Sequence, residues 1–306
     1  MNRVSWARRA HNLRRIVVLG IVLALTALVV PPSAVRDLPT SLVKVESARG
    51  IDHRPHVIWV LMLGSDARPG QAVLRSRADA IQLVGINTKT GAGTAIGIPR
   101  DSYVNVRGHG RNKINSAMLF GGPQLMAKAV GDMVGIRPDY VFTTSFRGFA
   151  AMVNAIGGIT VQSKFRFSDP VKPKGYKVGK NRLNGMQAHI FSRIRKSFPN
   201  GDFDRSANQQ RTMVGILKEV RSKADKPGFM ERALFSVARN LDTNLAPSEL
   251  FTLAQAATRV DPRKFSRCVI QGGTGFAGAA SVVYPNIGQA RGYAKRARND
   301  ATLSRC

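Results

Sequence analysis

The distribution of apolar positions predicts short strands alternating with helices. Six segments are short runs rich in β-branched and other apolar residues, as expected of buried strands: 56–63, 79–87, 94–98, 139–145, 159–164 and 265–271. Seven further segments carry apolar residues at helical spacing or end in helix-stop signals: 122–136, 146–158, 183–195, 204–224, 229–241, 248–260 and 287–300. This alternation predicts a layered α/β domain with helices on both faces of a sheet.

Local signals mark where three of these helices begin. Pro123 stands in the first turn of the 122–136 helix, a position that proline favours. The 183–195 helix is predicted to begin at Asn184, and Asp204 is placed at the cap position of the long amphipathic helix 204–224. The basic segment 287–300 is predicted to be a final surface helix.

The N-terminal segment has the pattern of a membrane anchor. A basic tail, residues 1–15, precedes the apolar run that begins at Ile16, and with its weakly polar end the segment 16–35 is long enough for a thin or tilted span. Arginines before the span predict a cytoplasmic N-terminus and a domain outside the membrane. A cleaved signal peptide is the alternative, although Pro31–Ala34 matches a cleavage site poorly. Residues 36–54 are predicted to be a linker.

The charge of the chain favours anionic partners. The 306 residues contain 47 Lys and Arg against 18 Asp and Glu, a net charge of +29. Only five of these arginines lie in the first 30 residues, so most of the excess belongs to the predicted domain. Nucleic acid, anionic lipid, phosphates and acidic polymers all fit such a charge. Export of the domain makes nucleic acid an unexpected partner.

Cysteine and histidine give little evidence of a metal centre. The two cysteines, Cys268 and Cys306, either form a disulfide outside the cytoplasm or remain free thiols. The five histidines show no ligand spacing, and no Cys/His cluster suggests zinc. His189 falls in an apolar part of a predicted helix, which favours a structural role.

Charged residues gather at the ends of the predicted elements. Four segments contribute: Asp66 after the first strand, Arg77 and Asp79 before the second, Arg100 and Asp101 after the third, and Arg193, Arg195 and residues 202–210 at the junction of two helices. Arginine forks match phosphate oxygens, and a helix N-terminus attracts the same groups. Carboxylates among arginines either pair with them or hold a hard cation such as Mg²⁺.

Each of these residues also has an ordinary structural explanation. An aspartate in the position of Asp66 commonly stabilises a turn, Asp204 suits a helix cap, and Lys196 suits a solvated surface. The loop GSDARPG lacks the Lys and Ser/Thr of a Walker motif, which disfavours a nucleoside triphosphatase. The case for a phosphate site rests on the whole set.

Eight short motifs in one order resemble the LytR-CpsA-Psr (LCP) family. They are GSD (64–66), RAD (77–79), GIPRD (97–101), KINSA (113–117), VNAIGGI (153–159), LNGMQA (183–188), RIR (193–195) and GDFDRSANQ (201–209). The resemblance spans about residues 55–225, with 226–306 completing the same domain. It implies an α/β/α sandwich with a mixed central sheet and a deep apolar pocket for a prenyl tail.

The resemblance implies an enzyme that transfers a glycopolymer from a polyprenyl-pyrophosphate carrier to peptidoglycan. Asp66 and Asp79 would hold Mg²⁺ or Mn²⁺, and with Arg77 and Arg100 they would form the catalytic set. The pyrophosphate would be bound by Arg77, Arg100, Arg193, Arg195, Arg205 and Gln209. Lys113 and Asp202 are weaker candidates that would orient their neighbours. Asp66 or Asp79 is a candidate general base only if it is not committed to the metal. The helices 122–136 and 204–224 are candidates to line the lipid pocket.

The sequence departs from the family pattern at three places. Ala78 replaces a serine, Asn154 replaces an aspartate, and the segment DRSANQQR lacks the usual glutamine after Arg205 and has Asn208 where an arginine is common. These changes leave the proposed metal ligands and arginines in place. Two alternatives remain open: a polyprenyl-pyrophosphate hydrolase with water as acceptor, and a non-catalytic polyanion-binding regulator.

Overall fold

A computed structural model describes residues 40–48, 50–51, 56–68, 70–224, 226–229 and 241–306. The predicted tail and anchor, residues 1–35, and nearly all of the predicted helix 229–241 lie outside the described residues. The described residues belong to one compact unit. None of the helices in the described ranges is long and apolar enough to cross a membrane.

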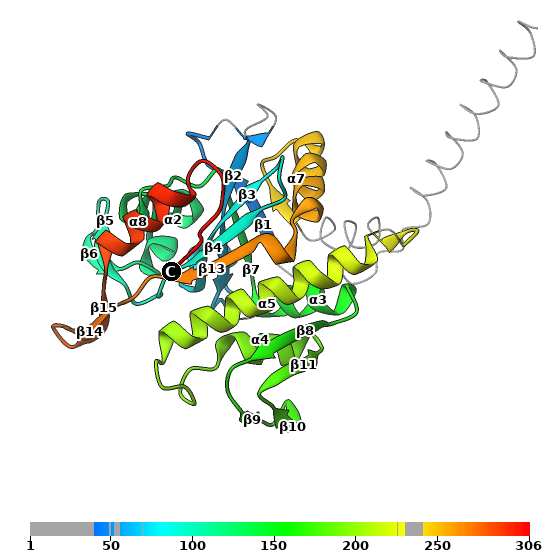
Figure 1. Cartoon of the computed structure of the whole chain (residues 1–306). Helices are drawn as coiled ribbons and strands as arrows, with labels where there is room; N and C mark the ends of the chain where they lie inside the picture. The colour runs from blue at the N-terminus through cyan, green and yellow to red at the C-terminus, as the bar shows by residue number, and fades with distance from the viewer. Residues whose placement is uncertain (1–39, 49, 52–55, 69, 225, 230–240) are drawn as a thin grey trace, which may run out of the picture. The chain divides into compact units, whose positions relative to one another are not determined.

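A seven-stranded sheet runs through the centre of this unit (Figure 1). Its order is β12 (Leu241–Thr243), β1 (Thr40–Lys44), β7 (Tyr140–Thr144), β2 (Val57–Ser65), β3 (Ala78–Asn87), β4 (Gly93–Gly97) and β13 (Phe265–Val269). The pairs β7–β2, β4–β13 and β1–β12 are parallel, and the pairs β1–β7, β2–β3 and β3–β4 are antiparallel. The predicted α/β fold with a mixed central sheet is confirmed.

Strand β1 corrects the linker prediction. Residues Thr40–Lys44, inside the predicted linker 36–54, pair with β7 along their whole length and with β12 over three residues. Thr40 and Ser41 are buried despite their polar side chains. The short stretch TSLVK shows no clear alternation, so its role as an inner strand depends on neighbours that are distant in sequence.

Alternating side chains of the sheet pack against helices on both faces. Leu61 and Leu63 of β2 belong to the core cluster that includes α2 (Ser116–Val134) and α8 (Ile287–Ala297). Ile58 packs on the opposite side, with α7 (Pro247–Arg259), and α5 (Asp202–Lys223) covers β3 and β4 on that side too. The period-two alternation of the strands therefore separates two hydrophobic layers.

A smaller lobe packs against the outer side of α5. It comprises α3 (Phe146–Ala155), α4 (Gly185–Arg193), and the strand pairs β8 (Ile159–Ser163) with β11 (Gly179–Leu183) and β9 (Phe167–Asp169) with β10 (Lys172–Tyr176). These elements enclose an aromatic cluster that includes Phe167, Tyr176 and Phe191. Gly185 lets α4 approach α3, because a Cβ there would lie 1.9 Å from the carbonyl oxygen of Ala150.

Of the two predicted helix caps, Asn184 and Asp204, only Asn184 is a cap in the structure. Asn184 caps α4 as predicted, and its side chain forms a reciprocal capping box with Gln187. Asp204 is not a cap, because α5 begins two residues earlier and its cap residue is Gly201. The Asp204 carboxylate instead accepts hydrogen bonds from the backbone and side-chain nitrogens of Asn200.

The helix predicted from Pro123 is part of a longer element. The helix α2 extends over Ser116–Val134, but Gly121 and Gly122 within it have non-helical backbone angles, and Gly122 has a φ of 63°. A proline directly after this break stands in the first turn of the second helical piece. The predicted start of the 122–136 helix therefore coincides with a real interruption.

Two hairpins complete the unit. β5 (Tyr103–Val106) pairs with β6 (Gly110–Lys113), and β14 (Gly272–Ala277) pairs with β15 (Ala280–Pro285). One single turn of 3₁₀ helix, Val73–Arg75, connects β2 to β3, and another, Pro262–Lys264, connects α7 to β13. A bridge between Ser102 and Val283 joins the two hairpins beside the end of β4.

Cys268 of β13 and Cys306 form a disulfide across 38 residues of sequence, with their Cα atoms 5.3 Å apart. Reduction, or Cys306→Ser, is expected to lower the free energy of unfolding by about 2–4 kcal/mol, because the crosslink restricts the unfolded chain. Thermal unfolding with and without reductant measures this. The Cys306→Ser variant should no longer respond to reductant, and a wild type equally indifferent to it would contradict the prediction.

Candidate active site

The predicted site residues lie at one edge of the central sheet. Asp66 directly follows β2, Asp79 is the second residue of β3, and Arg100 comes three residues after β4. Because β3 runs antiparallel to both neighbours, its first residues lie beside the last residues of β2, as the pairing of Ser65 with Ala78 shows. Sequence-distant charges are therefore neighbours in space.

Arg100 connects three carboxylates. Its guanidinium forms an ion pair and a hydrogen bond with Asp79, and its Nε lies 3.6 Å from Asp101 Oδ2. The backbone nitrogen of Arg100 also donates to Asp202 Oδ2 at 3.2 Å. Although burial opposes the shift, the charges of Asp79 and Asp101 raise the pKa of Arg100, so the side chain stays cationic.

Arg205 reaches the same cluster from the first turn of α5. It is buried and forms an ion pair with Asp202, one turn earlier in the helix. Asp202 thus lies between Arg205 and the backbone of Arg100, which fits the orienting role predicted for it. The Nζ of Lys113 lies 3.0 Å from Asp101 Oδ1 and adds a further positive charge beside the cluster.

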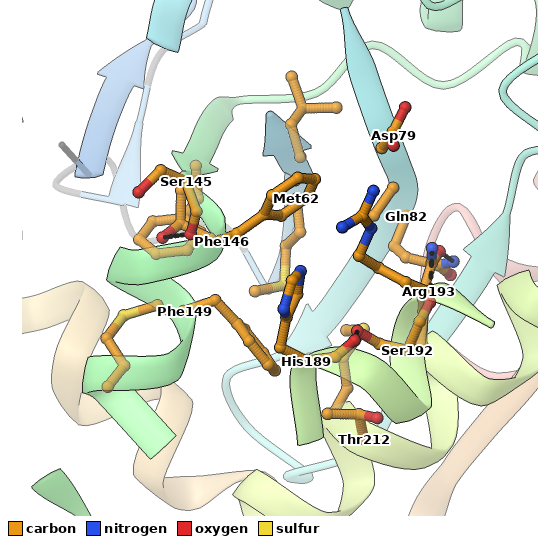
Figure 2. Close-up of a pocket in the computed structure, with 18 of the residues that line it drawn as sticks. Met62, Asp79, Gln82, Ser145, Phe146, Phe149, His189, Ser192, Arg193 and Thr212 are labelled. Atoms are coloured by element: carbon orange, nitrogen blue, oxygen red, sulfur yellow. Dashed lines mark hydrogen bonds between the residues drawn. The ribbon is translucent and has the colours of Figure 1, made fainter. Parts of the chain in front are cut away.

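A pocket with about 840 Å³ of empty space opens beside this cluster. Asp79, Arg193, Arg205 and Gln209 line it together with a larger apolar set: Met62, Leu63, Phe142, Phe146, Phe149, Met152, Met213 and Ile216. In Figure 2 Asp79, Gln82 and Arg193 lie on one side of the pocket, and Phe146 and Phe149 lie on the other. The pocket therefore joins a charged end to an apolar interior.

Arg77, Arg193 and Arg195 are all exposed, but only Arg193 lines the pocket. Arg193 ends α4, and its guanidinium stacks 4.3 Å from the centre of the Phe146 ring. Arg77 and Arg195 are exposed and form no ion pair with the carboxylates of the described residues, but their charges act on Asp66 and Arg205, respectively. The structure thus brings Asp79, Arg100, Arg193, Arg205 and Gln209 together and leaves Arg77 and Arg195 at the surface.

The apolar wall of the pocket differs from the prediction in one helix. Residues of α5 line the pocket, as predicted for the 204–224 helix. The 122–136 helix does not line it, because the buried side chains of α2 pack into the core on the other face of the sheet. The helix α3, with Phe146, Phe149 and Met152, takes that place. Its apolar residues at i and i+3 are also what an ordinary core helix shows, so the sequence could not separate the two roles.

Gln82 is a site residue that the sequence analysis missed. It lies in the pocket wall, and its Nε2 donates to Gln209 Oε1 at 3.0 Å and to Ser206 Oγ at 3.0 Å. Its Oε1 accepts from Gln210 at 3.1 Å. An uncharged polar residue in the middle of the apolar strand 79–87 was the available signal, since buried amides need partners.

Asp66 and Asp79 are suited to hold a divalent cation. Burial raises the pKa of Asp66, and the negative charge of Asp79 raises it further, so the two carboxylates repel one another. A cation between them would relieve this repulsion. Within the described part of the chain no group of three His, Cys, Asp or Glu residues is placed to hold a metal. Further ligands would come from substrate phosphates or water, as is usual for Mg²⁺.

His189 lines the pocket as a neutral imidazole. Its ring stacks on Phe146 at a centroid distance of 4.5 Å, and burial, helped by the charge of Arg193, lowers its pKa to about 4. The structural role predicted for His189 is therefore consistent with its surroundings.

His189 makes the stability of the fold depend on pH. An unfolded histidine takes up a proton near pH 6.5, but the folded one resists it until about pH 4. The free energy of unfolding should therefore fall as pH drops through this window, by at most about 3 kcal/mol. Urea unfolding at several pH values, compared with His189→Gln, measures this. A variant with the same pH slope as wild type would contradict it.

Comparison with known proteins gives one consistent result. Residues 38–296 match the LytR_cpsA_psr family. The chain is 30% identical over 197 residues to a polyisoprenyl-teichoic acid–peptidoglycan teichoic acid transferase TagU of Bacillus anthracis, a match covering 64% of this chain and 63% of that relative. It is 34% identical over 216 residues to the TagU transferase of Bacillus licheniformis, covering 69% of this chain and 67% of that one.

Solved structures show the same fold. TagT bound to LI-WTA superposes with a TM-score of 0.65 and 27% identity, over 80% of this chain and 91% of that one. TagT with bound octaprenyl pyrophosphate lipid gives a TM-score of 0.61 and 25% identity, over 80% and 90%. Bacillus subtilis TagV gives 0.65 and 25%, over 82% and 99%. The resemblance carried by the eight motifs is confirmed, and this chain belongs to the LytR_cpsA_psr family.

Proposed function

We propose that this protein transfers a glycopolymer from a polyprenyl-pyrophosphate carrier to peptidoglycan. One observation supports this above all: a single pocket places Arg193, Arg205 and Gln209 at one end of an apolar interior. Such a pocket matches a ligand with an anionic head and a long hydrocarbon tail. Relatives named as teichoic acid transferases, and a related structure with octaprenyl pyrophosphate, agree with this choice of ligand.

The arginines would bind the pyrophosphate. Arg193, Arg205 and Gln209 face the pocket, and Arg100 lies within the same charge cluster through Asp79 and Asp202. Arg77 and Arg195 would add charge at the rim, where exposed guanidinium groups attract an incoming polyanion. Fixed cations that meet charge as it develops on phosphate oxygens stabilise the transition state more than the ground state.

The reaction would be phosphoryl transfer. A hydroxyl of peptidoglycan attacks the sugar-proximal phosphorus, a new O–P bond forms, and the bond to the bridging oxygen breaks. Polyprenyl phosphate leaves with that oxygen. Mg²⁺ or Mn²⁺, held by Asp66 and Asp79, would neutralise charge on the pyrophosphate. The hydroxyl proton would pass to one of these two carboxylates only where that carboxylate is not bound to the metal.

The location follows from the N-terminal pattern. We propose that residues 16–35 anchor the chain in the cytoplasmic membrane, with residues 1–15 in the cytoplasm and the domain on the outer surface. There the enzyme would meet both a membrane-embedded carrier and peptidoglycan. An excess of Lys and Arg suits an anionic glycopolymer and an anionic membrane surface.

Transfer by the full chain in detergent tests the proposal. A polyprenyl-pyrophosphate glycan with labelled sugar is mixed with peptidoglycan oligomers, with Mg²⁺ or with EDTA. We expect labelled peptidoglycan with Mg²⁺, a loss of at least about 100-fold with EDTA, and recovery when Mg²⁺ or Mn²⁺ is returned.

Product analysis distinguishes the alternatives. Release of the labelled glycan phosphate without transfer would show a hydrolase in place of a ligase. Binding of the lipid with no turnover of either kind, over several glycans, would show a polyanion-binding protein. Full activity in EDTA would leave the ligase standing and overturn the metal assignment of Asp66 and Asp79.

A further inference from the structure

A second cavity lies on the other side of α5 from the first pocket. It holds about 890 Å³ of empty space and is lined by residues of α5, β13, α8 and Cys306. The N-terminal half of α5 is shared between the two. Arg205, Gln209 and Thr212 face the first pocket, and Ala207, Gln210 and Arg211 face the second.

The second cavity contains two arginines from different elements of the fold. Arg211 is partly buried, and its Nη1 donates to Asn208 Oδ1 at 2.6 Å. Arg267 comes from β13 and faces the same cavity. Neither guanidinium forms an ion pair with any carboxylate of the described residues. Two acidic groups belong to the described lining: the Asp204 carboxylate, which already accepts two hydrogen bonds from Asn200, and the terminal carboxylate of Cys306.

The positive charges of Arg211 and Arg267 repel each other. Burial lowers the pKa of Arg211, and the positive charge of Arg267 lowers it further, against a smaller opposing effect of Asp204. This repulsion has a cost, and burial adds to it for the partly buried Arg211, whereas Arg267 is exposed to solvent. An anion between them would remove that cost and accept hydrogen bonds from both guanidinium groups.

We propose that this second cavity binds a phosphate group, with Arg211 and Arg267 as its cationic contacts. Guanidinium forks match the oxygens of phosphate in geometry, and a phosphate can accept from both arginines at once. Amide groups of Gln271 and Gln289 in the lining supply further polar surface. The ligand is either free phosphate or a phosphodiester within a longer polymer, since both present the same oxygens.

The site is separate from the pyrophosphate pocket. Between the two cavities, Gln210 donates to Cys268 O at 2.8 Å and to Gln82 Oε1 at 3.1 Å. Gln82 in turn donates to Gln209 at 3.0 Å. These buried amides fill the space between the cavities, so one phosphate cannot contact both arginine sets. The proposal does not depend on the catalytic activity of the protein.

Calorimetric titration of the full chain in detergent tests the site. Inorganic phosphate is titrated into wild type, Arg211→Gln, Arg267→Gln, the first-pocket variant Arg193→Gln, and Arg291→Gln as a control with an exposed arginine on α8 outside the lining. We expect two phosphates per wild-type chain. Arg211→Gln and Arg267→Gln should each weaken one of them at least about tenfold, and Arg193→Gln should weaken the other.

Each result of the titration either supports or overturns the second phosphate site. Wild-type affinity and stoichiometry in both Arg211→Gln and Arg267→Gln would overturn the proposal, as would a single phosphate site lost in Arg193→Gln. Arg267 is exposed, so its variant keeps the test valid even if Arg211→Gln unfolds. Repeating the titration with dimethyl phosphate identifies the source: equal binding points to a phosphodiester, and binding of inorganic phosphate alone points to free phosphate.

Discussion

Replacing Arg100 by alanine is expected to lower kcat for glycopolymer transfer by about 10²–10³-fold, the usual effect of removing one preorganised charge contact to a transition state. In the folded protein the Arg100 guanidinium pairs with Asp79 and lies 3.6 Å from Asp101. Without it, Asp66 and Asp79 lose a nearby positive charge. The anionic substrate would then meet carboxylates with less compensation.

A matched control separates this effect from loss of an ion pair in general. Arg107 also forms a paired contact with a carboxylate, at 2.6 Å to Asp132, but it is exposed and outside the site. The transfer rate of Arg107→Ala should stay within about twofold of the wild-type rate, because exposed ion pairs contribute little to stability. Initial rates at saturating lipid, with circular dichroism to verify folding, provide the measurement. Equal rates for Arg100→Ala and wild type would remove Arg100 from the site.

A carboxylate placed in the apolar wall is expected to abolish lipid binding. Met152 of α3 is partly buried and lines the pocket. Met152→Asp would put a charge where the prenyl chain is proposed to lie, and each buried methylene of that chain contributes about 0.8 kcal/mol. We expect the KM for a long-chain carrier to rise at least about 100-fold.

The dependence on chain length distinguishes this from general damage. Met186 of α4 is 49% exposed and does not line the pocket, so Met186→Asp is the matched control and should bind as wild type. A short-chain soluble analogue should show a much smaller difference between Met152→Asp and wild type. If both chain lengths suffer equally, the prenyl tail does not occupy this part of the pocket.

Local signals explain which parts of the fold could be predicted. The strands 56–63, 79–87 and 94–98 are apolar enough to be recognised alone, and Asn184 carries its own capping partner three residues later. Strands β1, β10 and β11 have mixed, lysine-containing sequences. Their strand conformation depends on partners far along the chain, which a single sequence does not display.

The candidate site also has one part that the sequence could predict and another that it could not. Motifs identified the charged and polar residues, because Asp79, Arg100, Arg205 and Gln209 each lie in a short distinctive segment. The apolar half of the pocket has no such mark, since Phe149 or Met152 on a helix predicts burial without saying against what. Gln82 lies between these cases: its polarity was visible, but its link to α5 required the fold.

The C-terminal residues pack against the outermost strand β13. β13 is an outermost strand, and such strands offer unpaired backbone groups to other chains. Leu303 donates its backbone N–H to Ser266 Oγ, and the disulfide holds Cys306 against Cys268. The tail therefore covers part of this outermost strand, and because its crosslink forms in an oxidising compartment, reduction is expected to leave the strand more open to edge-to-edge pairing.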